Sequence, residues 1–277
     1  MDKRKIGALQ VVLAAFSWSF SGVFCKWIPW SSITIIGLRG LVTAFILGLS
    51  RKSFKVRITR GTLLGALGAC LNCILIMMAM KLTTSANAIV LQYAMPAFVI
   101  ALCWIFYRQR PSRTDLVTAV CVLAGVALCS WEGLVSGGGQ RLGDLLALLS
   151  AVAYALVYFC ARMPDTNATD YVYLGCLFCI PFSGYAFFDP KMTLEPIHLL
   201  AICAMGLSLA GGYYFISKSL NNVHPVTSAL LANLEPVLNP IWVFLFLGER
   251  PGVFTLIGAA VVIAAVSVYS VLGIRKQ

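Results

Sequence analysis

Long apolar runs separated by short polar connections divide almost the whole chain. A run of about 20 mostly apolar residues is long enough to cross the hydrocarbon core of a bilayer as a helix. Ten such runs can be drawn, at approximately 6–25, 32–50, 61–80, 86–107, 113–131, 142–162, 170–188, 196–217, 224–247 and 252–273. The connections leave no room for a separate soluble domain. The pattern therefore predicts an all-α integral membrane protein with ten transmembrane helices.

The second half of the chain partly repeats the first. Three pairs of similar residues recur at nearly constant spacing: Pro96 with Pro236 and Phe106 with Phe246 at an offset of 140, and Trp18 with Tyr154 at an offset of 136. An offset near half the chain length indicates a duplicated unit. We expect one repeat in residues 1–135, with helices one to five, and another in residues 136–277, with helices six to ten. Because five is odd, the second repeat must enter the membrane from the opposite side, which predicts two inverted repeats.

Composition supports a lipid environment. Apolar residues make up 60% of the chain and charged residues 11%, and the mean hydropathy is +0.89, whereas charged residues make up about a quarter of soluble proteins. The net charge of +11 does not indicate nucleic-acid binding, because the basic residues are spread over short connections and form no single basic patch. The expected partners are the lipid bilayer and a small-molecule substrate, with no nucleic acid; the oligomeric state is left open.

The basic residues also predict the orientation. Of the 21 Lys and Arg residues, 15 lie at the termini or in one alternate set of connections. Because cytoplasmic connections carry the excess of Lys and Arg, both termini are predicted to be cytoplasmic. Residues 1–23 begin like a signal peptide, but their apolar run is long enough to span, so we interpret them as a retained first helix.

Two charged residues stand clearly inside predicted helices. Glu235 lies near the middle of helix nine and Arg39 lies inside helix two at a similar depth. Such charges cost roughly 2.5–3.5 kcal/mol each on insertion scales, so they usually face a cavity or a partner. One interpretation is a structural ion pair, or an Arg39 side chain that reaches toward the interface. The other is that Arg39 binds a carboxylate and Glu235 an ammonium group or a coupling proton. Met95 occupies the position equivalent to Glu235 in the first repeat, which favours the functional interpretation.

Further polar and aromatic residues lie at similar depth. Pro96 and Pro236 each remove a backbone donor from a helix interior, which predicts kinks in helices four and nine. Trp18 and Tyr154 are deep for aromatic residues, and their faces could hold an apolar side chain or an ammonium group; packing is the alternative. The predicted substrate-binding residues are Trp18, Arg39, Asn72, Gln92, Tyr93, Tyr154, Asn233 and Glu235.

The chain lacks the signals of an enzyme or a nucleotide-driven pump. It has no GxxxxGK[ST] loop, and its two isolated histidines, His198 and His224, cannot build a catalytic or metal-binding cluster. Two CxxC spacings, at 70–73 and 176–179, fall inside predicted helices, where packing is favoured over metal or redox work. We therefore expect no enzyme, no metal and no cofactor. Energy is expected from an ion gradient, with proton coupling as one option, or from the substrate's own concentration difference.

Three motifs carry a family resemblance. Residues 234–251 (LEPVLNPIWVFLFLGERP), 18–22 (WSFSG) and 143–148 (GDLLAL), in this order and spacing, resemble the EamA family of the drug/metabolite transporter superfamily. The resemblance implies a multi-pass carrier of a bacterial plasma (inner) membrane, and many such carriers export amino acids and related metabolites. One departure is that the first repeat has RQR at 108–110 where the second has GER at 248–250.

We therefore expect a secondary active transporter that works by alternating access and exports small polar metabolites, most simply amino acids or related zwitterions. The alternative keeps the fold and changes the ligand to organic cations, quaternary amines or drugs, bound by Glu235 and an aromatic cavity. A membrane enzyme would need a polar catalytic cluster, which the sequence lacks.

Overall fold

The computed structural model describes residues 3–136, 138–220, 222–223, 227–228, 231–248 and 252–275. All regular elements in this part of the chain are helical, and it contains no strand. The elements are α1 (Lys3–Trp18), α2 (Ser21–Trp27), α3 (Ser32–Arg51), α4 (Arg60–Leu82), α5 (Ser85–Gln92), α6 (Met95–Tyr107), α7 (Arg113–Ser136), α8 (Gly138–Phe159), η1 (Cys160–Arg162), α9 (Ala168–Cys179), η2 (Ile180–Phe187), α10 (Pro196–Leu220), η3 (Ala232–Leu234), α12 (Glu235–Leu247) and α13 (Val253–Arg275).

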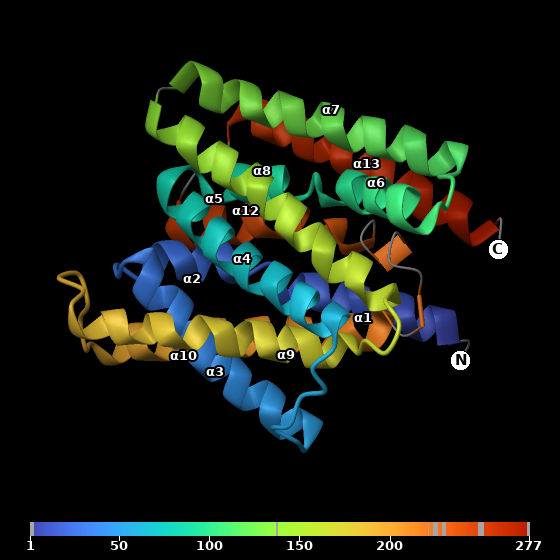
Figure 1. Ribbon diagram of the computed structural model, residues 1–277. Helices are drawn as coiled ribbons and strands as arrows, with labels where there is room; N and C mark the ends of the chain where they lie inside the picture. The colour runs from blue at the N-terminus through green and yellow to red at the C-terminus, as the bar shows by residue number, and fades with distance from the viewer. Residues whose placement is uncertain are drawn as a thin grey trace.

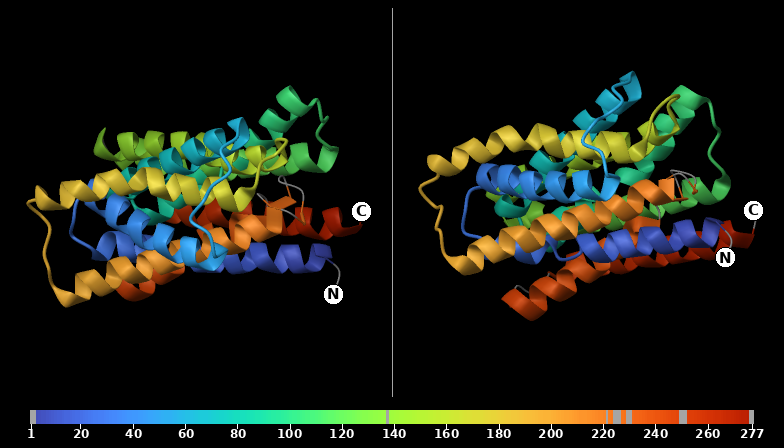
Figure 2. Two further views of the ribbon diagram at one scale, coloured as in Figure 1. Left: turned by 60° about the horizontal axis from the view of Figure 1, so that its bottom comes forward. Right: turned by 90° about the horizontal axis from the view of Figure 1, so that it is seen from below.

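The helices form one elongated bundle whose long axis most of them follow (Figures 1 and 2). The two chain ends are marked at the same end of the bundle in every view (Figures 1 and 2). At one edge α7 packs against α13, and at the other α10 packs against α3 and α9. Between these edges α4 contacts both α8 and α9, so elements from the two halves of the sequence interleave.

Six helical stretches of the described chain are long and apolar enough to cross a membrane: Ile6–Trp27, Ser32–Arg51, Arg60–Leu82, Asn87–Tyr107, Arg141–Arg162 and Pro196–Leu220. Many large apolar side chains on the outside of the bundle are exposed, among them Phe45 and Leu207. A continuous apolar exterior is what contact with lipid requires. The protein is therefore an all-helical, multi-pass membrane protein.

Four of the predicted helices are interrupted or change type in their middle, and one of them is the seventh, which passes from α9 to η2 at Ile180. The first run ends as α1 at Trp18 and resumes as α2 at Ser21, and the fourth ends as α5 at Gln92 and resumes as α6 at Met95. In the ninth run, the described residues change from η3 to α12 at Glu235.

The breaks explain where the prolines lie. Pro96 is in the first turn of α6 and Pro236 is in the first turn of α12, whereas the sequence placed both in the interior of a continuous helix. A proline in the first turn is well tolerated, because the N–H group that it lacks would have no partner inside the helix. The chain therefore ends α5 before Pro96 and changes from the 3-10 turn η3 to α12 just before Pro236.

The helices that follow the two prolines correspond closely. Helices α6 and α12 each contain 13 residues, and their first residues, Met95 and Glu235, are separated by the same offset as the prolines. Each helix ends at a residue with left-handed backbone, Arg108 at φ 52° and Gly248 at φ 67°. The local similarity noticed in the sequence thus extends to the way each helix begins and ends.

Candidate substrate cavity

A cavity lies where the broken helices meet. The break between α1 and α2 contributes Trp18 and Ser21, the end of α5 contributes Gln92, and the start of α12 contributes Glu235. The full lining is Trp18, Ser21, Arg39, Asn72, Cys73, Ile76, Met80, Ile89, Gln92, Tyr154, Leu209, Tyr213 and Glu235. Its volume is about 50 Å³, which is room for about four water-sized groups. Interrupted helices at membrane depth are tolerated where they line such a cavity.

Glu235 forms the acidic end of the site. Its side chain is only 5% exposed, and Tyr93 donates a hydrogen bond of 2.5 Å to its Oε2. Glu235 is the first residue of α12. Tyr154 lines the cavity together with Glu235, and the Tyr158 hydroxyl donates to the Tyr154 hydroxyl at 3.4 Å.

Arg39 supplies a cation to the same cavity. It is 4% exposed on α3, and its Nε has no hydrogen-bond partner. Cys73 lines the cavity together with Arg39, and the Cys73 sulfur lies 3.4 Å from the Tyr213 hydroxyl. Both charged residues are described in full, and no ion pair joins Arg39 to Glu235. The structural ion pair considered from the sequence is therefore not formed in this conformation.

A hydrogen-bonded amide pair adds a polar section of wall. Gln92 Nε2 donates to Asn72 Oδ1 at 2.6 Å, which links α5 to α4. Each residue is buried and each lines the cavity. Buried amides need such partners, because an unpaired polar group at membrane depth costs several kcal/mol.

Trp18 supplies the main aromatic surface. Its ring makes edge-on contacts with Tyr154, at 6.0 Å between ring centroids, and with Tyr213, at 5.6 Å. The indole lies against α10 at Gly212, where a Cβ atom would be only 2.0 Å from Trp18 Nε1. The position of Trp18 thus depends on the absence of a side chain at Gly212.

Helix α12 also stabilises the break that carries Trp18. The Asn239 amide donates to the Ser19 carbonyl at 2.8 Å, and Trp242 Nε1 donates to Ser19 Oγ at 3.0 Å. The Ser19 carbonyl lies at the interruption between α1 and α2, so it needs a partner from outside its own helix. Helix α12 therefore stabilises the break between α1 and α2, next to Trp18.

Six of the eight predicted binding residues line this one cavity: Trp18, Arg39, Asn72, Gln92, Tyr154 and Glu235. Tyr93 is not part of the lining but bonds to Glu235. The side chains of Asn233 and Pro236 lie outside the described residues.

The sequence did not indicate the remaining lining residues. They are Ser21, Cys73, Ile76, Met80, Ile89, Leu209 and Tyr213. Three of them follow Asn72 along α4, namely Cys73, Ile76 and Met80. Ile76 and Met80 lie four and eight residues after Asn72, so counting in steps of four along the helix would have found these two.

A bundle of apolar helices around a buried, charged cavity is the architecture of a membrane transport protein. The chain matches the EamA-like transporter family over residues 5–131 and 141–271. It therefore belongs to that family, which is part of the drug/metabolite transporter superfamily. The two matched segments correspond to the two repeats of the family.

One relative agrees with this assignment, and one solved structure shares the fold. A protein from Archaeoglobus fulgidus described as an uncharacterized transporter is 27% identical over 203 residues, which is 68% of each chain. A solved structure described only as the crystal structure of a protein superposes with a TM-score of 0.70 at 17% identity, covering 97% of this chain and 98% of the other. The second likeness shows a shared fold, and the family match shows a membrane transporter.

Proposed function

We propose that this protein is a secondary active transporter that exports amino acids or related zwitterions by alternating access. The observation that carries the proposal is that Arg39 and Glu235 are both buried, line one cavity and do not pair with each other. An uncompensated buried charge is costly. A zwitterion offers a partner to each: its carboxylate accepts hydrogen bonds from Arg39, and its ammonium group donates to Glu235.

The rest of the wall fits a small substrate with an apolar part. Ile76, Met80 and Leu209 offer apolar surface in the same cavity as the two charges. The Asn72–Gln92 pair offers polar groups. The volume of about 50 Å³ suits a substrate of a few heavy atoms in this conformation, and opening toward one compartment enlarges it.

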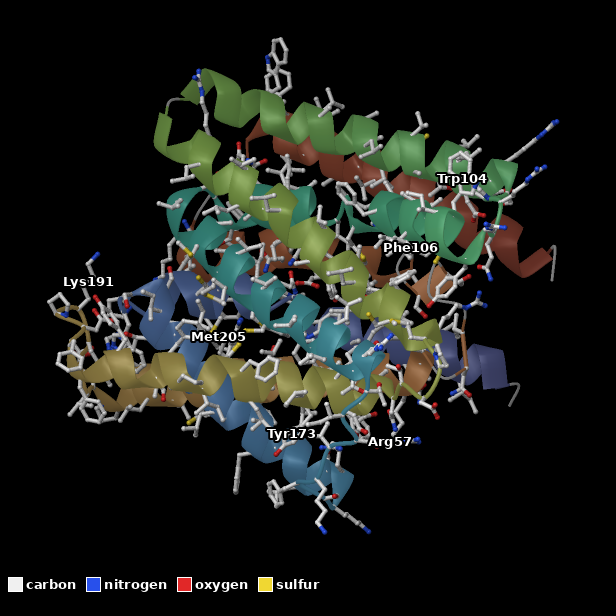
Figure 3. The ribbon with its side chains drawn as sticks, viewed as in Figure 1. Arg57, Trp104, Phe106, Tyr173, Lys191 and Met205 are labelled. Atoms are coloured by element: carbon white, nitrogen blue, oxygen red, sulfur yellow. The ribbon has the colours of Figure 1, made fainter. Side chains whose placement is uncertain are left out.

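The proposed architecture is ten transmembrane helices in two inverted repeats, residues 1–135 and 136–277, with both termini on the cytoplasmic side of a bacterial plasma membrane. The location of both chain ends at one end of the bundle supports an even number of spans (Figure 2). Arg57, from a connection rich in basic residues, lies toward that end, and Lys191 lies at the other (Figure 3). Helices broken beside a central site are the feature that carriers with inverted repeats use to bind substrate and coupling ion.

Proton exchange at Glu235 is the proposed source of energy. A buried carboxylate within reach of the cavity can hold either a proton or the substrate ammonium group, which couples the two movements. The hydrogen bond from Tyr93 keeps the carboxylate in one orientation for both ligands.

A second candidate substrate class is organic cations, including quaternary amines and drugs. The observation that favours it is the aromatic surface of Trp18 and Tyr154 in the cavity that Glu235 lines. Aromatic faces bind ammonium groups by cation–π attraction. For such a substrate Glu235 is required and Arg39 is not.

Transport by purified protein in proteoliposomes tests the proposal. Thermal-shift screening against amino acids, amines and nucleosides selects the substrate, and uptake of that labelled substrate is then compared among variants. For a zwitterion, Glu235→Gln and Arg39→Gln should each reduce uptake at least tenfold, since each removes a charge-assisted contact worth about 1.5–3 kcal/mol.

The matched controls carry the same substitutions at exposed positions. Arg57 is 72% exposed and Glu195 is 62% exposed, so Arg57→Gln and Glu195→Gln should leave uptake unchanged. Loss in Glu235→Gln with full activity in Arg39→Gln would assign the organic-cation class. Normal uptake in both cavity variants would overturn the proposed site.

A further inference from the structure

The two CxxC segments meet beside the cavity. Cys70 and Cys73 belong to α4, and Cys176 and Cys179 belong to α9. All four side chains are buried, and the Cys179 and Cys70 sulfur atoms are 3.7 Å apart. Cys73 lies three residues after Cys70 on α4, so the two thiols lie on the same side of that helix. Two helices from opposite halves of the chain thus bring their thiols together.

The backbones of these helices approach closely. A Cβ atom at Gly175 would lie 2.7 Å from Ala69 Cβ and 2.9 Å from the Ala66 carbonyl oxygen, so α9 packs directly on α4. On the other side, a Cβ atom at Gly40 of α3 would lie 2.8 Å from Cys179 Cβ. A disulfide needs short distances between its two backbones. The small residues around the thiols supply that proximity.

Cys73 is the member of the cluster that faces the cavity. It is a lining residue, and its sulfur atom lies 3.4 Å from the Tyr213 hydroxyl. Arg39 lines the same cavity. A small neutral oxidant that enters the cavity therefore meets the Cys73 thiol.

We propose that Cys73 and Cys179 form a peroxide-sensitive disulfide site that cross-links α4 to α9. In the first step the Cys73 sulfur attacks hydrogen peroxide and the O–O bond breaks. Cys73 becomes a sulfenic acid, and the departing hydroxide takes the proton of the Cys73 thiol to give water. In the second step the Cys179 sulfur attacks the sulfenic sulfur, the S–O bond breaks, and the released hydroxide takes the Cys179 proton to give water. Overall, two thiols and one peroxide give one disulfide and two waters, with both sulfurs oxidised and both peroxide oxygens reduced.

Cys70 and Cys176 complete the site without binding a metal. The Cys70 sulfur contacts the Cys179 sulfur. Cys70 can therefore bond to Cys179 in place of Cys73, or exchange with the Cys73–Cys179 disulfide. Over the described part of the chain, no group of three or more His, Cys, Asp and Glu side chains is placed to hold a metal ion.

The cross-link joins the two halves of the transporter. Helix α4 lies in the first segment that matches the family and α9 lies in the second. If transport requires the halves to move against each other, the disulfide stops it. This consequence rests on the proposed function, whereas formation of the disulfide does not.

Peptide mass spectrometry of the purified full chain tests the site directly. The protein in detergent is treated with hydrogen peroxide, free thiols are blocked with iodoacetamide, and the digest is searched for a disulfide between segments 70–73 and 176–179. The link should form in the wild type and disappear with dithiothreitol. Absence of the link under conditions that oxidise the exposed thiol of Cys203 would overturn the proposal.

Serine variants assign the roles within the site. Cys73→Ser should slow cross-linking at least tenfold, and Cys179→Ser should leave a sulfenic or sulfinic acid on Cys73, detected with dimedone or by its mass. Cys103→Ser is the matched control, because Cys103 is buried on α6; it should cross-link like the wild type. Equal cross-linking rates in Cys73→Ser and the wild type would overturn the role of Cys73.

Uptake measurements before and after oxidation distinguish failure of the disulfide proposal from failure of the proposed transport function. Peroxide should abolish uptake by the wild type, dithiothreitol should restore it, and uptake by Cys179→Ser should survive peroxide. A disulfide that forms without loss of uptake would support the thiol site and contradict movement of α4 against α9. Absence of uptake before any oxidation would contradict the proposed function alone, since the disulfide is measured independently.

Discussion

The Tyr93 hydroxyl donates a 2.5 Å hydrogen bond to Oε2 of Glu235, across 142 positions of sequence. Tyr93 lies in the break between α5 and α6, and Glu235 is the first residue of α12. The bond therefore joins two helix interruptions, one from each half of the chain. Because it lies at the cavity, a movement that separates the halves at this point must also change the surroundings of the Glu235 carboxylate.

Replacement of Tyr93 by phenylalanine should destabilise the protein by about 2 kcal/mol, because it removes a hydrogen bond to an ionisable acceptor and leaves that acceptor buried. The measurement is the free energy of unfolding in mixed micelles titrated with SDS. Tyr185→Phe, at an exposed tyrosine, is the control and should cost little. In a Glu235→Gln background the effect of Tyr93→Phe should fall to about 1 kcal/mol. An unchanged effect would show that the bond to Glu235 does not matter.

Two adjacent glycines of α10 should respond in opposite directions to alanine. A Cβ atom at Gly212 would be 2.0 Å from Trp18 Nε1, whereas one at Gly211 would be 3.4 Å from Ser17 Oγ. Gly212→Ala should therefore displace Trp18 and cost about 1–3 kcal/mol. Gly211→Ala fits and should stabilise the helix by about 0.5–1 kcal/mol. Thermal unfolding and uptake measured on both variants check this, and equal behaviour would contradict the close contact with Trp18.

Asp189 should make stability depend on pH in the acid range. Burial alone would raise the pKa of the Asp189 carboxyl, but hydrogen bonds from the Thr34 and Ser31 side chains and from the Ser31 and Lys191 backbones outweigh it and lower the pKa from 3.8 to about 2. The bonds from Ser31 N and Thr34 Oγ1 measure 2.9 Å and 2.5 Å. Because the folded-state pKa is depressed, this contribution to stability is present above about pH 3.8 and is lost as the pH falls through about 2.

The matched variant is Asp189→Asn, which accepts hydrogen bonds but does not ionise. At pH 7 it should unfold at a lower temperature than the wild type. The difference between the two melting temperatures should shrink as the pH is lowered from 4 toward 2, as measured by thermal unfolding in detergent. A difference that stays constant over this range would show that ionisation of Asp189 is not the source of the stability.

A side chain at Gly248 would not clash with its neighbours, but it would strain the backbone. It ends α12 at φ 67°, and no atom lies within 4 Å of a Cβ built on it. Gly248→Ala should cost about 1–2 kcal/mol from left-handed strain alone. Gly184 also has open space around it but no positive φ, so Gly184→Ala should cost much less. The comparison uses the free energy of unfolding, and equal costs would contradict the strain.

Local signals in the sequence identified much of the site. Arg39 and Glu235 stood out because charges at membrane depth are expensive, and both line the cavity. Trp18 and Tyr154 were found because deep aromatic residues are unusual. Ile76 and Leu209 carried no signal, because an apolar lining residue cannot be distinguished by composition from one that faces lipid.

The helix breaks show where sequence reasoning reached its limit. The prolines located the breaks before α6 and α12 only approximately, since a proline is compatible with either a kink or a new helix start. Nothing comparable marks the break between Trp18 and Ser21. That break is stabilised by Asn239 and Trp242 of α12, whose positions depend on packing between distant segments.

The sequence by itself determined that this chain is a multi-span helical membrane protein with a partial internal repeat and a few buried charges, because hydrophobicity, period and the cost of burying charge are properties of short segments. Only the tertiary structure decided that Arg39 and Glu235 share a cavity without pairing and that the two CxxC segments meet. Those relationships depend on how helices far apart in the chain pack and rotate against one another. That packing is set by the shapes of all the contacting side chains together, which no local pattern contains.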